Sequence, residues 1–443
     1  MTPGGARTRL DRILDRIRAR SGAARLNPTD EMLLDAERSL GSSRVVQVLW
    51  RLPSPVSPEA LREEWHRLDR GRLSRRPVPA GFPGGRRVWV PAPNTEPPRH
   101  YAAALTDATV PDWLDEQVRA PLPAGSSALW RLAAAPYEAG ALVSLTVPHF
   151  RSDGLGIFTA LGAEGPVPAC RAGGAPGAAA RELAGWAVRT LADREERSRL
   201  VSALRTAPGP RAAGSAPRFF TTAFFDLDAA EWEERARARG GTANSLFVEI
   251  AANLVRARVP RDGRAPLRVG IPMDLRRGPG DERANALVVV PLEVPAGEPQ
   301  HTDLRRTRLE TKDALAGSGE HSTTLVPERL WHLLPGRYAS RLKAPGSQAT
   351  DVVASNFGEL PERVTRFAGQ RADRTALRTM NVPGVVPERA GLRASLCLVR
   401  TGERLTVTVT GMPDHFGDAR SLRDAVTEEF AAWGLRAEAW WTA

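Results

Sequence analysis

The sequence predicts an α/β (α+β) fold of two lobes, in which two mixed sheets are flanked by helices. Short runs rich in β-branched residues alternate with stretches of helical periodicity in both halves of the chain. Between these halves lies a segment at 206–217 (TAPGPRAAGSAP) whose composition favours a linker. A chain of 443 residues is also too long for one ordinary core. We therefore expect an N-terminal lobe over 25–205 and a C-terminal lobe over 218–443.

Residues 1–24 are expected to form an extension that contains an amphipathic helix. Within 7–20 (RTRLDRILDRIRAR), helical spacing gives one apolar face, made of Leu10, Ile13, Leu14 and Ile17. Such a basic helix can lie on a membrane surface. The interleaved Asp11 and Asp15 favour docking on the protein itself, and peripheral membrane contact is the alternative.

The expected elements of the N-terminal lobe follow from caps, periodicity and turn residues. Asn27–Pro28–Thr29 opens a helix, and Ser57 is a good N-cap for a second helix at 58–68. Prolines and glycines make most of 76–98 a loop. The remaining expected elements are strands at 45–49, 87–90 and 142–147 and a helix at 155–161.

The C-terminal lobe begins with the apolar run at 219–227. A helix at 244–258 places Leu246, Phe247, Ile250 and Leu254 on one face. A closing helix is expected at 419–433. The strands expected in this lobe lie at 268–271, 287–292, 352–356, 395–400 and 405–410.

Composition narrows the class of protein. The 42% hydrophobic and 26% charged residues are typical of a globular chain, and no run approaches the ~20 apolar residues of a spanning helix. The start lacks the apolar core of a signal peptide, so we expect a cytoplasmic location. The two cysteines, Cys170 and Cys397, are expected to be buried thiols, and no metal site is predicted.

The net charge of +11 comes almost wholly from arginine. Lysine occurs only at Lys312 and Lys343, and the arginines form no stripe with interleaved aromatic residues. A nucleic-acid partner is therefore not expected. A positive surface can still attract the phosphates of CoA or an acidic carrier protein.

The most informative segment is 143–154 (VSLTVPHFRSDG). Val143, Leu145, Val147 and His149 have the same parity, so they share one face if the strand continues that far. Pro148 and the Asp153–Gly154 turn end the strand. His149 is thus expected at the edge of a sheet, where a site between two lobes can use it.

His-x-x-x-Asp-Gly at the end of an apolar strand resembles the HHxxxDG signature of the condensation-domain and CoA-dependent acyltransferase superfamily. This superfamily includes peptide condensation domains, chloramphenicol acetyltransferase, plant BAHD acyltransferases, wax ester synthases and mycobacterial polyketide-associated acyltransferases. The second histidine of the signature, the base in that family, falls on His149, and the first falls on Pro148. BAHD-type members also lack the first histidine.

Three further segments resemble the family in the expected order. Residues 269–276 (VGIPMDLR), followed by Asn285, resemble its Pro-x-(Asp/Asn)-Leu-Arg strand and later asparagine. Residues 241–245 resemble the segment that usually precedes that strand, and 354–361 resemble its Ser-Asn-x-Gly stretch. The resemblance covers residues 25–436.

The resemblance implies a chloramphenicol acetyltransferase-like fold with a tunnel between the lobes. The pantetheine arm of CoA or of an acyl carrier protein would enter from one face and the acceptor from the other. His149 would be the general base, and Asp153 would pair with Arg276 to fix the turn. Gly154 is expected to give that turn its freedom. Ser355 or Asn356 could donate to the oxyanion, and a turn stabilised by Asn356 is the alternative for that segment.

The sequence therefore predicts an acyltransferase. It would move an acyl group from a CoA or carrier-protein thioester to a hydroxyl or amine of a small molecule, with no other cofactor. Two alternatives stay open. One is a non-catalytic, condensation-like recruitment domain, and the other is an amide-forming condensation domain that acts on a carrier protein.

Overall fold

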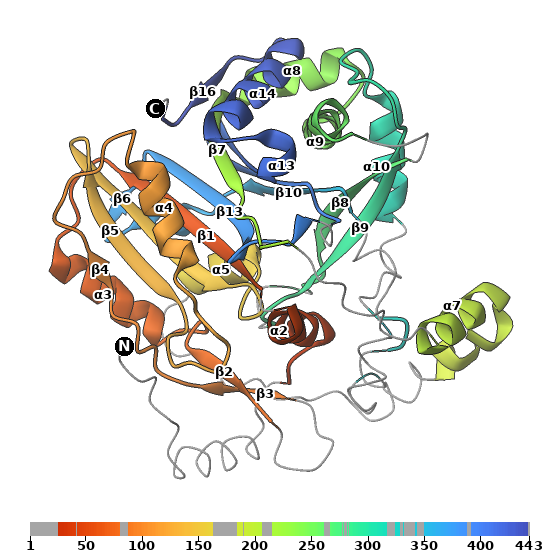
Figure 1. The fold of residues 1–443 in the computed structure, drawn as a ribbon, viewed down its shortest axis with the longest axis horizontal. Coiled ribbons are helices and arrows are strands. Elements are labelled where there is room, and N and C mark those ends of the chain that lie inside the picture. Colours follow the sequence, from red (N-terminus) through yellow and green to blue (C-terminus); the bar gives the residue numbers. More distant parts are fainter. Residues whose placement is uncertain are drawn as a thin grey trace.

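Two separate β-sheets form the centre of the computed structural model (Figure 1). The structure describes residues 25–40, 42–79, 87–162, 184–188, 190–205, 215–260, 266–276, 278, 281, 283–316, 324–327, 331, 342, 350–387 and 391–441. The expected extension at 1–24, Cys170 and most of the expected linker lie outside these residues.

The five-stranded sheet has the order β13-β1-β6-β5-β4. Its strands are β13 (Arg374–Val382), β1 (Ser43–Leu52), β6 (Gly140–Pro148), β5 (Arg131–Tyr137) and β4 (Arg99–His100). All neighbours are antiparallel except β4 and β5, which are parallel. The strands β1, β5 and β6 are nearly continuous apolar runs, which is typical of a sheet that is covered on both faces.

The seven-stranded sheet has the order β16-β7-β15-β14-β10-β8-β9. Its strands are β16 (Ala437–Ala439), β7 (Thr221–Asp228), β15 (Arg404–Gly411), β14 (Ala394–Thr401), β10 (Val352–Glu359), β8 (Leu267–Asp274) and β9 (Leu287–Val294). Only β10 runs parallel to its neighbours, so this sheet is mixed as well. The predicted class of two mixed sheets flanked by helices is confirmed.

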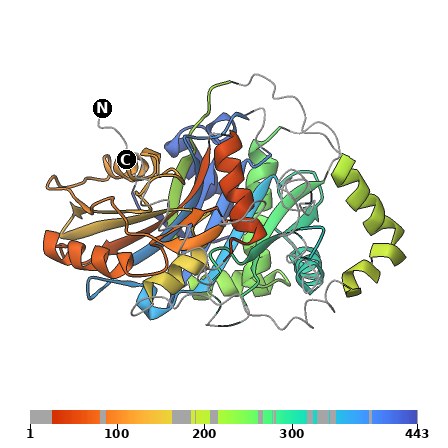
Figure 2. The same ribbon diagram turned by 90° about the horizontal axis from the view of Figure 1, so that it is seen from below.

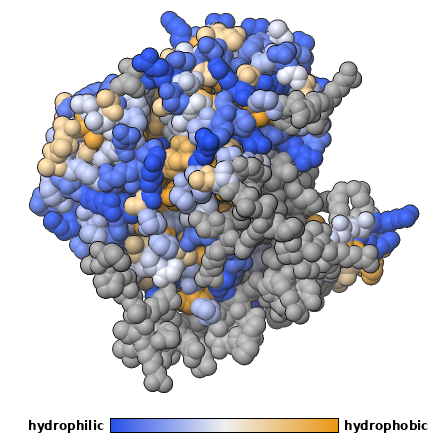
Figure 3. Space-filling view, in the orientation of Figure 1, coloured by the Kyte–Doolittle hydropathy of each residue, from blue (hydrophilic) through white to orange (hydrophobic). Residues whose placement is uncertain are grey.

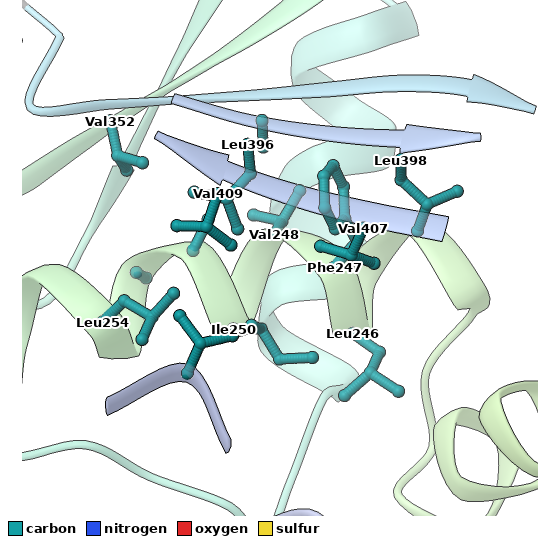
Figure 4. Close-up of a cluster of buried hydrophobic side chains, with 14 of the residues drawn as sticks. Leu246, Phe247, Val248, Ile250, Leu254, Val352, Leu396, Leu398, Val407 and Val409 are labelled. Atoms are coloured by element: carbon teal, nitrogen blue, oxygen red, sulfur yellow. The ribbon is translucent and has the colours of Figure 1, made fainter. Parts of the chain in front are cut away.

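Helices cover one face of the seven-stranded sheet. They are α8 (Ala229–Ala238), α9 (Ala243–Arg258), α10 (Arg305–Ala316) and α14 (Ala419–Ala432). Helix α9 begins with a capping box between Thr242 and Ser245, and its buried face packs beneath the strands (Figure 4). Phe247 and Val248 lie between the helix and the strands, near Val407 of β15, whereas Leu246 and Ile250 point away from these strands and are buried on the other side of the helix.

The other face of that sheet meets the five-stranded sheet. One continuous core joins β1, β5 and β6 to Cys397 and Val399 of β14, and it includes Trp50 and Trp130. Cys397 is a free buried thiol, as predicted, and burial raises its pKa to about 12. Helix α5 (Gly154–Leu161) fills part of the same core.

The remaining elements surround these layers. They are α2 (Pro28–Leu40), α3 (Pro58–Asp69), β2 (Arg75–Val78), β3 (Val88–Pro91), α4 (Val110–Arg119), α7 (Arg194–Arg205), η3 (Glu362–Val364), β11 (Arg366–Phe367), β12 (Gln370–Arg371) and α13 (Pro413–Phe416). Helix α7 stands apart from the two layers in both ribbon views (Figure 2). Helix α2 lies across the line where the two sheets meet.

Strand β13 departs from the division into lobes at 206–217. It follows β10 in the chain, yet it pairs with β1 along its whole length, in the sheet otherwise built from residues before 150. The strand was not predicted, because polar residues, among them Arg378, make up more than half of its sequence, RTALRTMNV. In the folded chain Arg378 is buried and forms an ion pair with Asp115, 3.0 Å away.

Hydrophilic side chains cover most of the described surface on the face in Figure 3. Among the residues that the structure describes, no helix combines the length and the apolar character needed to cross a membrane.

Candidate active site

A pocket of about 420 Å³ lies between the two sheets. Its walls come from β1 and β13 of one sheet and from β8, β9, β10 and β14 of the other. Helices α2 and α5 complete it. All six residues expected at the site from the sequence line this pocket: His149, Asp153, Gly154, Arg276, Ser355 and Asn356. This pocket lies between the two sheets, where the tunnel was expected.

His149 follows the last residue of β6. Its backbone N–H donates to the carbonyl of Arg44 on β1 at 2.7 Å, so the ladder between the two strands continues through His149. Its side chain therefore lies on the face of Val147, as the parity predicted. Pro148 has the opposite parity and does not line the pocket, so the missing first histidine removes no group from it.

The contact with Asn285 determines which nitrogen of His149 carries a proton. Both hydrogens of the Asn285 amide are used, because Nδ2 donates to Asp30 Oδ1 at 2.8 Å and to the carbonyl of Phe150 at 3.2 Å. Asn285 Oδ1 must therefore accept from Nδ1 of His149, 3.0 Å away. With the proton on Nδ1, the lone pair of the imidazole is on Nε2.

Asp30 in turn holds Asn285 in this orientation. Its carboxylate is fully buried and accepts four N–H groups, from the backbone and side chain of Asn285, the backbone of Asn27 and the indole of Trp89. Burial raises the pKa of Asp30 to about 7, against the opposing effect of these donors. A chain of hydrogen bonds thus runs from helix α2 through Asn285 to His149.

The surroundings of His149 favour its neutral form. Burial, and then the positive charge of Arg44, lower the pKa of His149 to about 4. The carboxylate of Asp153 acts in the opposite direction. Neutral imidazole is the form that can accept a proton, so His149 is available as a base at neutral pH.

Asp153 forms the ion pair with Arg276 that the resemblance implies, with 2.8 Å between Oδ1 and Nη2. It is also the N-cap of α5, through the backbone N–H of Gly156, and its Oδ2 accepts from the backbone of Ala286. Arg276 also binds Asp274 at 2.9 Å. With these contacts Asp153 fixes the start of α5 and the loop before β9, and both lie beside His149.

The reason for a glycine at position 154 differs from the expected one. Gly154 is the first residue of α5, and it is not among the glycines with positive φ. A Cβ at this position would lie 2.5 Å from Cε1 of Phe357 on β10. Gly154 is therefore required for the close approach of Phe357 and not for the freedom of the turn.

Ser355 and Asn356 differ in whether their side chains already form hydrogen bonds within the chain. The amide of Asn356 donates to Asn244 at 3.0 Å and accepts from the backbone of Gly358 at 2.9 Å. Gly358 has a φ of 64°, so Asn356 stabilises a turn, which was the alternative for this segment. Ser355 lines the pocket, and its hydroxyl has no hydrogen-bond partner within the part of the chain that the structure describes.

Two residues of the site have no role in the sequence motifs. Asp30 belongs to the segment at 27–30 that fits the superfamily, but no role at the site was expected for it; it forms a reciprocal pair of hydrogen bonds with Asn27 at the start of α2. Arg44 precedes an apolar strand, where arginine is common at a strand end. Arg44 lies opposite His149 because two distant strands pair, and Asp30 reaches His149 through Asn285.

No family model matches this sequence, and neither does any curated protein. Solved structures match almost the whole chain. The first condensation domain of the CDA synthetase is 16% identical with a TM-score of 0.57, over 94% of this chain and 99% of that chain. The condensation domain of the Monacolin K polyketide synthase MokA is 12% identical with a TM-score of 0.54, over 93% of this chain and 96% of that chain.

A third match was solved with small molecules. It is a mutant of the starter condensation domain of rhizomide synthetase RzmA, in complex with C8-CoA and Leu-SNAC, and it is 12% identical with a TM-score of 0.56. The match covers 95% of this chain and 96% of that chain. At such identities the likeness establishes the fold. The chain therefore has the fold of a condensation domain, and this is the fold of the condensation-domain and CoA-dependent acyltransferase superfamily that its motifs resemble.

Proposed function

We propose that this protein is an acyltransferase that moves an acyl group from a CoA or carrier-protein thioester to a hydroxyl or amine acceptor. The observation that carries the proposal is His149, a neutral histidine in a pocket between the two sheets, with its proton held on Nδ1 by Asn285. A base with a free Nε2 is what this reaction needs, because the thioester is already activated and only the acceptor must lose a proton.

The reaction balances with this one base. His149 Nε2 takes the proton of the acceptor O–H or N–H as the oxygen or nitrogen attacks the thioester carbonyl carbon. The tetrahedral intermediate then collapses, the carbon–sulfur bond breaks, and the imidazolium returns the proton to the leaving sulfur. The products are an ester or amide and a free thiol, and no further cofactor is consumed.

Ser355 is our candidate for the oxyanion donor. Its hydroxyl lines the pocket from the sheet opposite His149, whereas the amide of Asn356 is used by its own turn. Removing one good oxyanion donor costs about 10²–10³-fold in rate in known cases. The ion pair of Asp153 and Arg276 has a positioning role in this proposal, because both partners are bound to each other.

Thiol release tests the proposal. The full chain is incubated with a panel of acyl-CoAs and acyl carrier proteins and with pooled alcohol and amine acceptors. Because a domain of this fold has been solved with C8-CoA and Leu-SNAC, the panel includes a medium-chain acyl-CoA and an aminoacyl thioester acceptor. We expect acceptor-dependent thiol release that falls by about 10²–10⁴-fold in His149→Ala.

The control is His66→Ala, because His66 is an exposed histidine on α3. It should leave the rate unchanged. If thiol release requires both a carrier protein and an amine acceptor, the protein is an amide-forming condensation domain, which is the second alternative. If wild type and His149→Ala are equally silent while a carrier protein still binds, a non-catalytic recruitment domain replaces the proposal.

A further inference from the structure

Three polar side chains lie in a row across the end of the five-stranded sheet. Arg44 of β1 lies opposite Asn381 of β13. On its other side it lies opposite His149, since Val45 pairs with Pro148 and the His149 N–H bonds to the Arg44 carbonyl. Residues directly opposite each other share a face and have Cβ atoms about 4.5–5.5 Å apart. All three line the pocket, so Arg44 is the direct neighbour of the candidate base.

Arg44 differs from the other charged groups of the pocket. Arg276 is bound by both Asp153 and Asp274. The guanidinium of Arg44, in contrast, forms no hydrogen bond and no ion pair with any part of the chain that the structure describes. Guanidinium presents several N–H donors in one plane and binds carboxylates in a bidentate manner. Arg44 is exposed and lines the pocket, so its guanidinium is accessible to an anion from outside the chain.

Asn381 offers a second donor beside Arg44. One hydrogen of its amide is directed to the hydroxyl of Ser42 at 3.3 Å, and this hydroxyl donates to the carbonyl of Gly384 at 3.0 Å. The other amide hydrogen has no partner within the described residues. A carboxylate between Arg44 and Asn381 would thus meet donors from two neighbouring strands.

We propose that Arg44, assisted by Asn381, binds a carboxylate of the acceptor, so that the substrates of this site are hydroxy acids or amino acids. This inference rests on the proposed acyl transfer and names its acceptor class. Arg44 lies opposite His149 on neighbouring strands and its charge acts on the imidazole, so an anion on Arg44 would lie near the atom that His149 deprotonates. The carboxylate should therefore be only a few bonds from the nucleophilic hydroxyl or amine.

The position of Arg44 also selects the acceptor over the thioester arm. The phosphate of CoA or of phosphopantetheine lies at the end of the arm remote from the thioester, whereas Arg44 is next to His149. The group closest to His149 is the one that gives up its proton, and this group belongs to the acceptor. Ser355, our candidate for the thioester oxygen, lies on the opposite sheet.

Binding of a carboxylate would also change His149 itself. The charged groups that act on His149 are Arg44 from β1 and Asp153 from the start of α5, and Asn285 links it to Asp30 of α2. Arg44 lowers the pKa of His149, so a carboxylate on Arg44 removes part of this effect. The base becomes stronger when the acceptor is in place.

Direct binding tests the proposal without turnover. Two acid and amide pairs, lactate with lactamide and 3-hydroxybutyrate with 3-hydroxybutyramide, are titrated into the full chain at low ionic strength and followed by calorimetry. A hydrogen-bonded charge contributes about 1.5–3 kcal/mol, so we expect the acids to bind about 10- to 100-fold more tightly than the amides. This preference should be lost in Arg44→Gln and partly kept in Arg44→Lys.

The matched control is Arg258→Gln, because Arg258 lies at the end of α9 and pairs with the exposed Glu428. It should keep the preference for acids. Thermal melting shows whether each variant is folded. If Arg44→Gln does not fold, Arg44→Lys, which keeps the positive charge, is compared with wild type instead. Equal binding of acids and amides, or equal binding by wild type and Arg44→Gln, would overturn the inference.

Turnover separates this inference from the proposed function. Acyl transfer that is equally fast to acids and amides would overturn the role of Arg44 and leave the transferase intact. Carboxylate binding that depends on Arg44, without transfer to any acceptor, would support the anion site and count against the transferase. Malonyl-CoA and succinyl-CoA are compared with butyryl-CoA. If Arg44→Gln slows transfer from malonyl-CoA and succinyl-CoA but not from butyryl-CoA, Arg44 binds the carboxylate of the donor, and the assignment to the acceptor is overturned.

Discussion

At the scale of single residues, the chemistry of the pocket depends on which nitrogen of His149 is protonated. Asn285 accepts from Nδ1 because its own amide hydrogens are used by Asp30 and Phe150. Asp30 is held in place by four N–H donors, so the orientation of Asn285 has little freedom. Asn285 and Asp30 are positioning residues, because they act on the substrate only through His149.

We predict that His149 remains neutral well below its ordinary titration range. Its pKa is lowered to about 4, first by burial and then by Arg44. In the unfolded chain the value is about 6.5, so the unfolded state binds the proton first. The stability contributed by neutral His149 is thus lost as the pH falls from about 6.5 through about 4.

Histidine-selective NMR measures this directly. The chain has seven histidines, and the His149 signal is assigned by its loss in His149→Ala. We expect this signal to keep its neutral position down to about pH 5. In Arg44→Gln the midpoint should move up, because one cause of the lowered pKa is gone. A wild-type midpoint near 6.5 would contradict the burial of this side chain.

Asn285→Ala should impair catalysis without removing any group that touches the substrate. The Nδ1 proton of His149 loses its acceptor, so both tautomers become populated. We expect kcat to lose part of the about 10²–10⁴-fold that a positioned base contributes, with little change in KM. Nitrogen chemical shifts of His149 report the tautomer.

The matched control for Asn285→Ala is Asn253→Ala. Asn253 is also a fully buried asparagine, but it binds Gln300 and Glu429 in the core beneath the seven-stranded sheet. Its loss should lower stability and leave the tautomer of His149 unchanged. A single Nδ1-protonated tautomer in Asn285→Ala would show that Asn285 does not control it.

At the scale of elements, the position of His149 depends on how α5 begins. Asp153 caps α5 and also bonds the backbone of Ala286, in the loop before β9. Gly154 then lets the ring of Phe357 approach the first turn of the helix. The contact of α5 with β10 therefore closes one wall of the pocket, and both Gly154 and Phe357 line it.

Gly154→Ala should be destabilising although alanine favours helices. Its Cβ would lie 2.5 Å from Phe357, which forces the ring or the helix to shift. Overpacking of this kind costs about 1–3 kcal/mol in the free energy of unfolding, which urea denaturation measures. Gly125→Ala is the control, because a Cβ there meets nothing within 4 Å. The double variant Gly154→Ala/Phe357→Leu should recover stability, which would confirm the clash. An unchanged midpoint of urea denaturation in Gly154→Ala alone would refute it.

At the scale of the whole molecule, β13 joins the two sheets. It is the edge strand of the five-stranded sheet, and its neighbours across the core are β14 and β15 of the other sheet. Arg378 of β13 binds Gln47 of β1, Thr222 of β7 and Asp115 of α4. One buried side chain thus contacts both sheets, and the pocket lies between them.

Arg378→Met should weaken the attachment between the sheets. Removing one partner of a buried ion pair costs about 3–5 kcal/mol when the remaining charge stays buried with no partner and no access to water. The Asp115 side chain is 24% exposed, so water can reach its carboxylate. We therefore expect a smaller loss in the free energy of unfolding, about 2–3 kcal/mol. Chemical denaturation measures this loss.

Two further variants interpret that measurement. Arg378→Met with Asp115→Asn should regain part of the stability, because the carboxylate of Asp115 would otherwise keep only the exposed Arg119, 3.5 Å away, as its ion-pair partner. Arg404→Met is the control, because Arg404 is 45% exposed and lies 3.7 Å from Asp226. Arg378→Met should therefore lower the free energy of unfolding clearly more than Arg404→Met does. Equal stability of Arg378→Met and wild type would show that the contacts of Arg378 do not hold the sheets together.

The features that could be predicted from the sequence alone are local ones. Ser57, Thr242 and Asp418 cap helices that begin close to where they were expected, because a cap bonds a backbone N–H only a few residues away. The parity of 143–149 placed His149 on the correct face, because side chains alternate along a strand. The two-sheet fold was predicted from such elements and from the motifs that resemble those of the superfamily.

Which of these residues come into contact depends on how the whole chain folds. His149 and Asn285 are 136 positions apart, and Asn285 and Asp30 are 255 positions apart. The row of Asn381, Arg44 and His149 exists because β13 returns to pair with β1 in one register. A shift of that register by one residue would turn Asn381 to the other face. Pairing between distant strands is set by the packing of the whole core, so no local pattern in the sequence could predict the unpaired arginine beside the base.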